Sequence, residues 1–289
     1  MKDETWFWHV RLGHVNFDSL KMMAQNEMLK GLPSIIHSNQ LCEGCLVGKQ
    51  FYKNFPKKST LRANQPLQEI HVDVCETIKP CLFGKKLYFL FFINDYNRKT
   101  WVYFLKEKSN VFSCFKKFKA LVQKESDYSI KSLRMDMDNE FCSNDFNEFY
   151  EDHGIKRLLM VPRSPQQNEV VERKNRSILN MARRCLKTFW LKFVDCAIYL
   201  SNRCPTKSLN DMTPQEAWSR RKPNVSHLKG FRSIGYVYVN DQVRTKVDVK
   251  SKRMIFVGYD QKSKGYKLFN PNEGKMVINK DVEFNKKGA

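Results

Sequence analysis

The sequence predicts an α/β (α+β) protein of three modules, and three observations lead to this prediction. Residues 1–64 place two histidines and two cysteines around one helical segment. Residues 65–208 alternate strand and helix patterns in the order β-β-β-α-β-α-β-α, which predicts a mixed sheet with helices on its faces. Residues 209–289 open with a short helix and continue as short strands between turns, which predicts a small, curled antiparallel barrel.

Composition points to a polyanionic partner. The chain has 289 residues, a formal net charge of +21 and 42% hydrophobic residues, enough for a sizeable core. Strong positive charge is typical of nucleic-acid-binding proteins, although ribosomal and membrane-surface proteins share it. No apolar run is long enough to span a bilayer and the N-terminus lacks a signal-peptide pattern, so we expect no membrane partner. Nine irregularly spaced cysteines favour thiols or metal ligands in a reducing compartment over disulfides.

The first module holds a candidate zinc site. His9 and His14 lie in HVRLGH, Cys42 and Cys45 lie in CEGC, and a segment with helical spacing separates the two pairs. Two imidazole nitrogens and two thiolates form a closed tetrahedral site, and such a site lets a small module fold. The alternative is two unrelated histidines and a redox or chance cysteine pair. Because both half-motifs flank one helical segment, the sequence favours one structural Zn²⁺. The basic stretch 48–64 that follows is either a linker or an arm that contacts nucleic acid.

The second module begins as a three-stranded antiparallel meander. Strand patterns cover residues 67–76, 87–94 and 100–105, with short turn signals between them. A helical period then covers 111–124, followed by a strand at 129–135, a short helix at 146–153 and a strand at 155–161.

Three carboxylates occupy distinctive positions in this module. Asp73 lies in the middle of an apolar strand, Asp136 directly follows another strand, and Glu172 lies on a basic helix that begins near Val170. Burying an unpaired carboxylate is costly, so Asp73 should face a metal, a cation or a cleft. Carboxylates that converge from two strands and a helix suit two hard divalent cations with open positions for phosphate oxygens. The alternative is a set of solvated acids in salt bridges.

The helix after Val170 is a candidate DNA-binding element. Its polar residues recur at helical spacing on one face, and its apolar residues mark another. We expect Arg176 and Arg183 to bind DNA phosphates near the carboxylates, and we include Arg173 and Lys174 among the candidate DNA-binding residues. An ordinary cationic solvent face is the alternative. In the preceding loop, the amides of Gln166, Gln167 and Asn168 either touch a DNA end or form a plain helix-entry turn.

These features together resemble one known family. Besides the His-His-Cys-Cys module, the matching stretches are GKQ, HVDV, NDYNRKTWVYFLK, EFYEDHGIK, SPQQNEVVERKNRSILNMAR, NRCPTKSLNDMTPQEAW and RRKPNVSHLKGF. Over nearly its whole length the chain resembles copia-type (pseudoviral) LTR-retrotransposon integrases, the integrase region of retrovirus-related Pol polyproteins. The resemblance implies a ribonuclease-H-like core over residues 65–208, a zinc-binding pre-integrase module before it and an SH3-like module after it.

The resemblance also implies a site and a reaction. Asp136 and Glu172 have the thirty-five-residue separation of the D,D(35)E signature, and Asp73 takes the first position of that triad. The family binds two catalytic Mg²⁺ or Mn²⁺ ions and acts on double-stranded DNA as a homo-multimer. It inserts element cDNA into target DNA by strand transfer, with 3′-end processing when water is the nucleophile. Its place of action is the nucleus, with a cytoplasmic particle stage for an active element.

The sequence departs from the family pattern at three places. Met137-Asp138-Asn139-Glu140 replaces Asn-Gly-Gly-Glu, Glu169 replaces a glycine, and the loop between Leu186 and Trp190 is shortened. These departures keep a second hypothesis open, a catalytically decayed or repurposed copy that binds DNA without enzymatic activity. A third hypothesis, a zinc-dependent RNA-binding protein, leaves the position of Asp73 unexplained. The C-terminal module either contacts DNA or a partner, or is a folded spacer.

Overall fold

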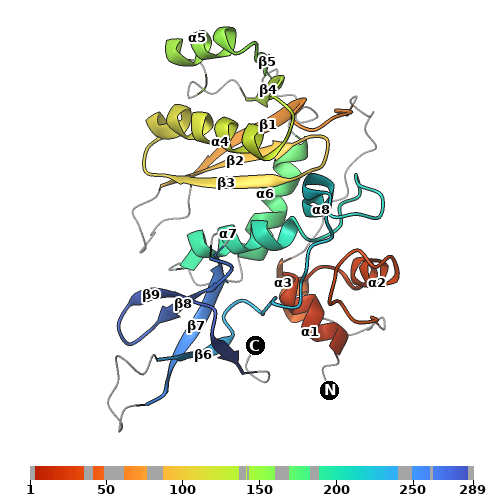
Figure 1. The fold of residues 1–289 in the computed structure, drawn as a ribbon, viewed down its shortest axis with the longest axis vertical. Coiled ribbons are helices and arrows are strands. Elements are labelled where there is room, and N and C mark those ends of the chain that lie inside the picture. Colours follow the sequence, from red (N-terminus) through yellow and green to blue (C-terminus); the bar gives the residue numbers. More distant parts are fainter. Residues whose placement is uncertain are drawn as a thin grey trace.

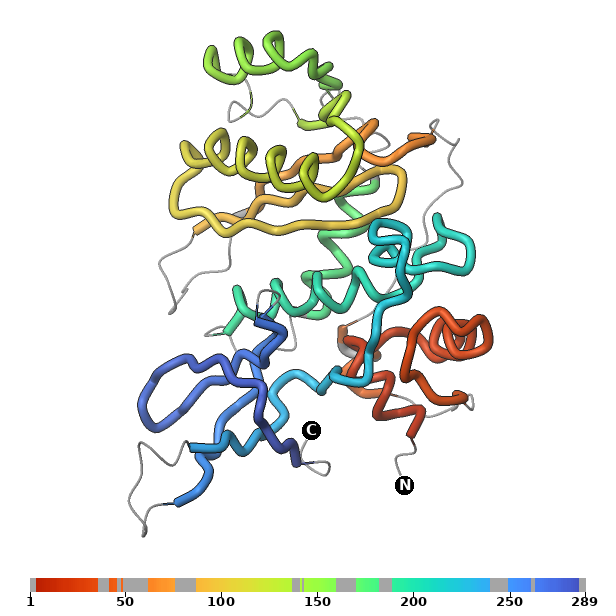
Figure 2. The backbone as a smooth tube through the Cα atoms, in the orientation of Figure 1, coloured from red at the N-terminus to blue at the C-terminus, as the bar shows by residue number. Residues whose placement is uncertain are grey.

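The chain folds as a central sheet with helices on both faces, a β module below it and a small helical module beside that (Figures 1 and 2). The computed structural model describes residues 4–35, 42–48, 62–76, 87–136, 141, 143–159, 169–182, 189–239, 249–260 and 263–285. None of the helices within these ranges is long and apolar enough to cross a membrane.

The core sheet has five strands in the order β3-β2-β1-β4-β5. The predicted meander is confirmed, because β2 pairs antiparallel with both β1 and β3. The chain then crosses over through a helix, so that β4 lies parallel to β1, and β5 lies parallel to β4. The strands are β1 (Glu69–Glu76), β2 (Tyr88–Asn94), β3 (Thr100–Leu105), β4 (Ser132–Met135) and β5 (Lys156–Leu159).

Helices cover both faces of this sheet around β2. On one face, α4 (Val111–Glu125) and α5 (Asn144–Asp152) cover an apolar cluster in which the rings of Phe92 and Phe118 stack 3.9 Å apart. On the other face, α6 (Glu169–Ala182) and α7 (Trp190–Ser201) pack against Phe89 and Phe91 of β2. Because β2 is covered on both sides, its sequence YFLFFIN is a continuous apolar run rather than an alternating one.

The C-terminal module is a five-stranded antiparallel sheet in the order β10-β6-β7-β8-β9. It follows the predicted short helix, α8 (Pro214–Ser219), whose N-cap Thr213 accepts a hydrogen bond from the Glu216 amide. The last predicted strand is split into two, because a turn at Lys280 separates β9 from β10. The strands are β6 (Ile234–Tyr238), β7 (Ser251–Tyr259), β8 (Tyr266–Asn270), β9 (Lys275–Asn279) and β10 (Val282–Phe284).

The N-terminal module consists of α1 (Glu4–Arg11), α2 (Phe17–Gln25) and α3 (Glu43–Gly48). The helical pattern between the His and Cys pairs is confirmed as α2, which ends at Gln25. The module shares one buried cluster with the rest of the chain, in which Trp8 and Leu20 pack with Leu200 of α7 and Phe256 of β7. Its hydrophobic core is therefore continuous with the later modules. The division of the chain at residues 64 and 208 stays a prediction.

A buried carboxylate fixes the start of the core. Asp95 accepts hydrogen bonds from the Ala63 amide at 2.7 Å, from Arg98 at 2.6 Å and from His71 Nε2 at 3.0 Å. Burial alone would raise the pKa of Asp95, but the hydrogen bond from His71 and the charge of Arg98 outweigh it and hold the pKa well below its usual range. The charged form of Asp95 therefore ties residue 63, β1 and the β2–β3 turn together.

We expect Asp95→Asn to lower the free energy of unfolding by about 2–4 kcal/mol at neutral pH, because it leaves Arg98 without its buried partner. A depressed carboxylate pKa stabilises the fold above the unfolded-state value and loses that effect as the pH falls. The difference between wild type and variant should therefore shrink below about pH 4 in urea unfolding curves. Asp152→Asn, at an exposed residue, is the control. A difference that stays constant down to the acid limit would contradict this account.

Candidate metal centre and carboxylate site

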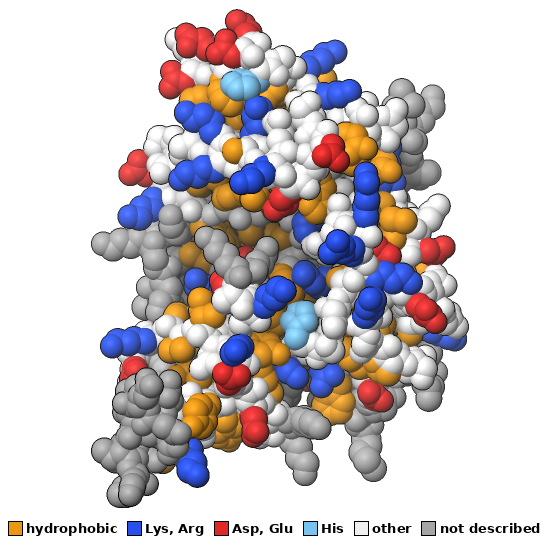
Figure 3. All heavy atoms as spheres, in the orientation of Figure 1, with side chains coloured by type: hydrophobic (Ala, Val, Ile, Leu, Met, Phe, Trp, Pro, Cys, Tyr) orange, Lys and Arg blue, Asp and Glu red, His pale blue; other side chains and the backbone are white. Residues whose placement is uncertain are grey.

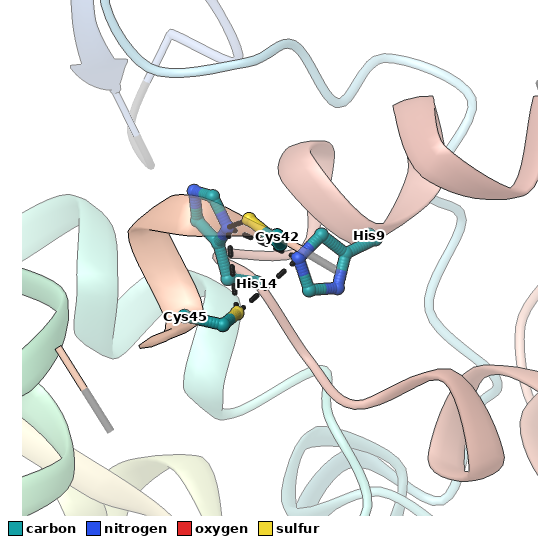
Figure 4. A group of neighbouring side chains, drawn as sticks. All are labelled: His9, His14, Cys42 and Cys45. Carbon is teal, nitrogen blue, oxygen red and sulfur yellow. Dashed lines mark hydrogen bonds between the residues drawn. The ribbon is translucent and has the colours of Figure 1, made fainter. Parts of the chain in front are cut away.

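The four predicted zinc ligands converge on one point. His9 comes from α1, His14 from the turn after it, and Cys42 and Cys45 from the start of α3 (Figure 4). Their ligand atoms all lie within 4.8 Å of one another. The His14 Nδ1 atom lies 3.1 Å from His9 Nε2 and 3.2 Å from Cys42 Sγ, and Cys45 Sγ lies 3.4 Å from His9 Nε2.

This geometry fits one tetrahedral metal ion. With metal–sulfur bonds of about 2.3 Å and metal–nitrogen bonds of about 2.0 Å, neighbouring ligand atoms lie roughly 3.3–3.8 Å apart. The second ring nitrogen of His9 lies 2.7 Å from the Val15 carbonyl oxygen, so it donates there and leaves Nε2 for the metal. Among the residues that the structure describes, this is the one set that groups as metal ligands.

A tight turn holds His14 in place. Gly13 and His14 both have positive φ angles, 71° and 62°, which reverse the chain directly after α1. A Cβ atom at Gly13 would lie 3.0 Å from Met181 Sδ of α6 and 3.4 Å from a methyl carbon of Leu200 on α7. The metal-binding turn therefore rests directly on the two helices that cover the core sheet.

The sheet register indicates that Asp73 and Asp136 lie on neighbouring strands at a similar level. In the parallel pair β1–β4, Ile70 lies opposite Leu133 and His71 opposite Arg134, where the pairing ends. If the same register is continued for two more residues, Asp73 comes level with Asp136, which directly follows β4. Neighbouring parallel strands lie about 4.8 Å apart, so this extension of the register brings the two carboxylates to the same end of the β1–β4 pair.

A thiol and an amide connect this edge to the helix that carries Glu172. The Cys75 thiol donates to Asp73 Oδ2 at 3.1 Å, and Asn175 Nδ2 of α6 donates to Cys75 Sγ at 3.0 Å. Burial and the neighbouring Asp73 charge raise the pKa of Cys75 far above its usual value, so it stays a protonated donor. Glu172 lies three residues before Asn175, on the same side of the helix. Sequence reasoning missed Cys75 and Asn175, because hydrogen bonds between distant segments leave no local pattern.

The predicted DNA-binding residues fall into two groups. Arg173 and Arg176 are exposed on α6, as is Glu172, whereas Lys174 donates from Nζ to Ser201 Oγ of α7 at 2.6 Å. Burial lowers the pKa of Lys174 to about 8. Four predicted DNA-contact residues lie outside the described residues: Gln166, Gln167, Asn168 and Arg183. The altered positions 137–140, which follow Asp136, also lie outside them.

Three family models match successive parts of the chain. The GAG-pre-integrase domain matches residues 1–50, the integrase core domain residues 63–165, and the retroviral polymerase SH3-like domain residues 233–288. The chain is 37% identical over 283 residues to the Retrovirus-related Pol polyprotein from transposon TNT 1-94 of Nicotiana tabacum, covering 96% of this chain and 21% of that protein. It is 31% identical over 288 residues to the polyprotein from transposon RE2 of Arabidopsis thaliana, covering 97% and 19%. The chain is a retrotransposon integrase region.

This integrase chain spans about a fifth of the length of those two curated relatives. A solved structure, the cryo-EM structure of the simian T-cell lymphotropic virus intasome in complex with PP2A regulatory subunit B56 gamma, matches with a TM-score of 0.46 and 11% identity. That match covers 84% of this chain and 87% of the other. The family models confirm the predicted fold class: a ribonuclease-H-like integrase core between a His₂Cys₂ module and an SH3-like module. The match to the integrase core ends before Glu172, so the role of the third acid stays a prediction.

We expect Asn175→Ala to lower the free energy of unfolding by about 1–2 kcal/mol, because it removes the donor that ties α6 to the Cys75 thiol. Ser177→Ala, on the exposed side of the same helix, should change it by less than about 0.5 kcal/mol. Denaturant titrations of the two variants and wild type measure this difference. Equal midpoints for Asn175→Ala and Ser177→Ala would show that the bond adds nothing.

Proposed function

We propose that this integrase inserts element cDNA into target DNA by metal-dependent strand transfer, with 3′-end trimming when water is the nucleophile. The observation that supports the proposal most is the parallel β1–β4 pairing, whose extension brings Asp73 level with Asp136, together with the contact between β1 and the helix of Glu172. Two hard carboxylates on neighbouring strands and a third on the helix packed against β1 would supply an oxygen-rich ligand set. In the structure their oxygens do not converge as closely as the ligand atoms of the His₂Cys₂ cluster do, so under this proposal bound metal ions draw them together.

The three acids have one task in this proposal. Asp73, Asp136 and Glu172 hold two Mg²⁺ or Mn²⁺ ions, which when bound activate the attacking 3′-hydroxyl and stabilise the leaving 3′-oxygen. Asp136 and Glu172 are exposed, so DNA can reach them. Asn175 Oδ1 is buried without a hydrogen-bond partner among the described residues, and it can accept a hydrogen bond from water in a metal's coordination shell. Cys75 and Asn175 orient Asp73 and keep α6 against β1.

Double-stranded DNA is the proposed substrate and partner. A net charge of +21 and the exposed Arg173 and Arg176 on the Glu172 helix supply phosphate contacts that depend little on sequence. Such contacts release counterions, so affinity should fall steeply with salt. Joining two element ends at one target requires more than one active site, so we propose that the protein acts as a homo-multimer on DNA. We propose the nucleus as its place of action.

For the His₂Cys₂ cluster we propose one structural Zn²⁺. Two thiolates and two imidazoles select Zn²⁺ over harder cations, and four protein ligands leave no open position for catalysis. The cluster joins α1 to α3 and supports the surface that contacts α6 and α7.

Purified protein should hold one zinc ion per chain, and Cys42→Ser should lose it and unfold the N-terminal module while the core stays folded. Elemental analysis measures the metal, and limited proteolysis shows which module opens. Cys204→Ser, at a cysteine outside the cluster, should keep its zinc. A folded N-terminal module without metal would refute the proposal.

The second candidate is a decayed copy that binds DNA without joining it. The observation that favours it is Met137-Asp138-Asn139 in place of the family's Asn-Gly-Gly, directly after Asp136. Both candidates keep the zinc module, the charge and the fold, so strand transfer with purified protein and matched terminal-repeat ends separates them.

If the site is active, Asp73→Asn, Asp136→Asn and Glu172→Gln should each reduce joining by at least about 10³-fold and leave DNA affinity unchanged, since binding uses the basic surface. Gel assays of joining and salt titrations of DNA binding measure the two effects. Wild type that binds DNA and joins nothing would support the decayed copy, and restoring Asn-Gly-Gly at residues 137–139 is then the rescue to test. Joining that persists in Asp136→Asn would show that the site lies elsewhere.

A further inference from the structure

A cavity of about 1200 Å³ lies where the edge strand β3, α7, α8 and the C-terminal module meet. We call it the junction cavity. Aromatic side chains form much of its wall: Trp101, Tyr199, Trp218, Tyr259 and Tyr266. The rings of Tyr199 and Tyr259 stack 4.5 Å apart, and those of Trp101 and Trp218 meet edge to face at 5.0 Å. Ligand sites often occupy such junctions between modules.

Arg203 enters this wall as a fixed cation. Its guanidinium lies 3.5 Å from the centroid of the Tyr199 ring, and one terminal nitrogen donates to the Tyr199 carbonyl at 2.9 Å. Its Nε atom is buried and has no hydrogen-bond partner among the described residues. No described carboxylate forms an ion pair with it. Stacking thus fixes the plane of the guanidinium while part of its donor capacity stays unused.

Lys99 brings a second cation to the same wall. Its ammonium donates to Gln215 Oε1 and lies 5.9 Å from the Trp101 ring centroid, and within the described ranges it has no ion pair. Burial, followed by the charge of Arg203, lowers the pKa of Lys99 to about 7. Both cations are only partly exposed, and Glu125 is the one acid whose charge raises the pKa of Lys99. Cations that have lost much of their hydration gain from an anionic partner, so two together without an ion pair indicate a site for an anion.

The acids of the wall have other hydrogen-bond or ion-pair partners or are exposed, and among them only Glu125 acts on Lys99 through its charge. Asp195 and Asp260 lie 2.9 Å and 3.9 Å from Lys267 Nζ, and Glu125 accepts a hydrogen bond from Trp218 Nε1 at 3.2 Å. Asp127 is exposed, after the end of α4. Figure 3 shows Lys and Arg side chains gathered around the middle of this face, between the core and the C-terminal module.

We propose that the junction cavity binds a nucleotide, with its phosphates on Lys99 and Arg203 and its base against the aromatic side chains. A guanidinium binds phosphate through paired hydrogen bonds, and aromatic rings stack on any base. The volume exceeds what a single phosphate requires and accommodates a nucleotide. A DNA duplex carries its phosphates on a convex surface, which suits an exposed basic face better than a recess at a module junction. This site is independent of the carboxylates of the proposed joining reaction.

The test uses the full chain without added Mg²⁺ and the probes ADP and inorganic pyrophosphate, at constant ionic strength. Thermal unfolding should show saturable stabilisation by both probes, because a ligand that binds only the folded state raises its melting temperature. Arg203→Gln and Lys99→Gln should each weaken both probes by about tenfold or more. Trp218→Leu should weaken ADP and leave pyrophosphate unchanged. Arg253→Gln, at an exposed residue of β7, is the matched control.

Several outcomes would overturn the proposal. ADP affinity that is the same in Arg203→Gln and wild type would place binding elsewhere on the basic surface. A short DNA duplex is tested as a competitor. If it displaces ADP and its own affinity falls in Arg203→Gln, the occupant of the cavity is DNA and not a nucleotide. If Arg203→Gln does not fold, Arg203→Lys keeps the charge and removes the paired donors, and its ADP affinity should still fall. Unchanged affinity in that variant would refute the assigned contact.

Discussion

The parallel register between β1 and β4 is the constraint on which the carboxylate site depends. Each strand places alternate side chains on opposite faces, so a slip of one residue would turn Asp73 away from the face covered by α6. Ser132 of β4 holds this register, because its hydroxyl donates to the carbonyl of Gln68, just before β1. On the other side of β1, Asp95 accepts a hydrogen bond from His71 and so ties β1 to the β2–β3 turn. Arg134 of β4 adds a bond of 2.5 Å to Glu69 of β1. Strand pairing and polar contacts of the protein itself therefore position the strands that carry Asp73 and lead into Asp136.

Helix α7 connects the three parts of the chain. It is buried on most of its surface, because the core sheet, the N-terminal module and β7 each cover a different side. Two glycines mark the closest approaches: Gly13 meets Leu200, and a Cβ atom at Gly258, which has a φ of 147°, would lie 3.7 Å from Cys196. Since α6 packs on α7 as well as on β1, the helix that carries Glu172 is held from both sides. A change in the zinc module or the C-terminal module can therefore reach the carboxylate site through packing.

Local patterns in the sequence predicted more of this structure than long-range contacts did. The meander, α4 and the His₂Cys₂ set could be predicted because apolar periodicity and ligand spacing lie within short windows. Helix α1 was missed because its eight residues hold three aromatic side chains and no clear cap. Helix α7 was missed because most of its residues are apolar and only a few polar ones mark its exposed side. The hydrogen bonds from Asn175 to Cys75 and from Cys75 to Asp73 join residues far apart in sequence, and so does the junction cavity. No sequence window contains both ends of such a contact, so only the fold reveals it.

The distribution of positive charge is the last consequence of this packing. Most Lys and Arg side chains can remain hydrated at the surface, where a net charge of +21 attracts a polyanion. Lys174, Lys99 and Arg203 instead lose water, and burial is the first cause of the lowered pKa in all three. Desolvated cations weaken the fold unless an anion comes close, and they bind that anion more strongly than exposed ones do. In the proposed nucleotide site, Lys99 and Arg203 would therefore gain most from a phosphate, whereas the exposed Arg173 and Arg176 of α6 are the residues proposed to contact the phosphates of DNA.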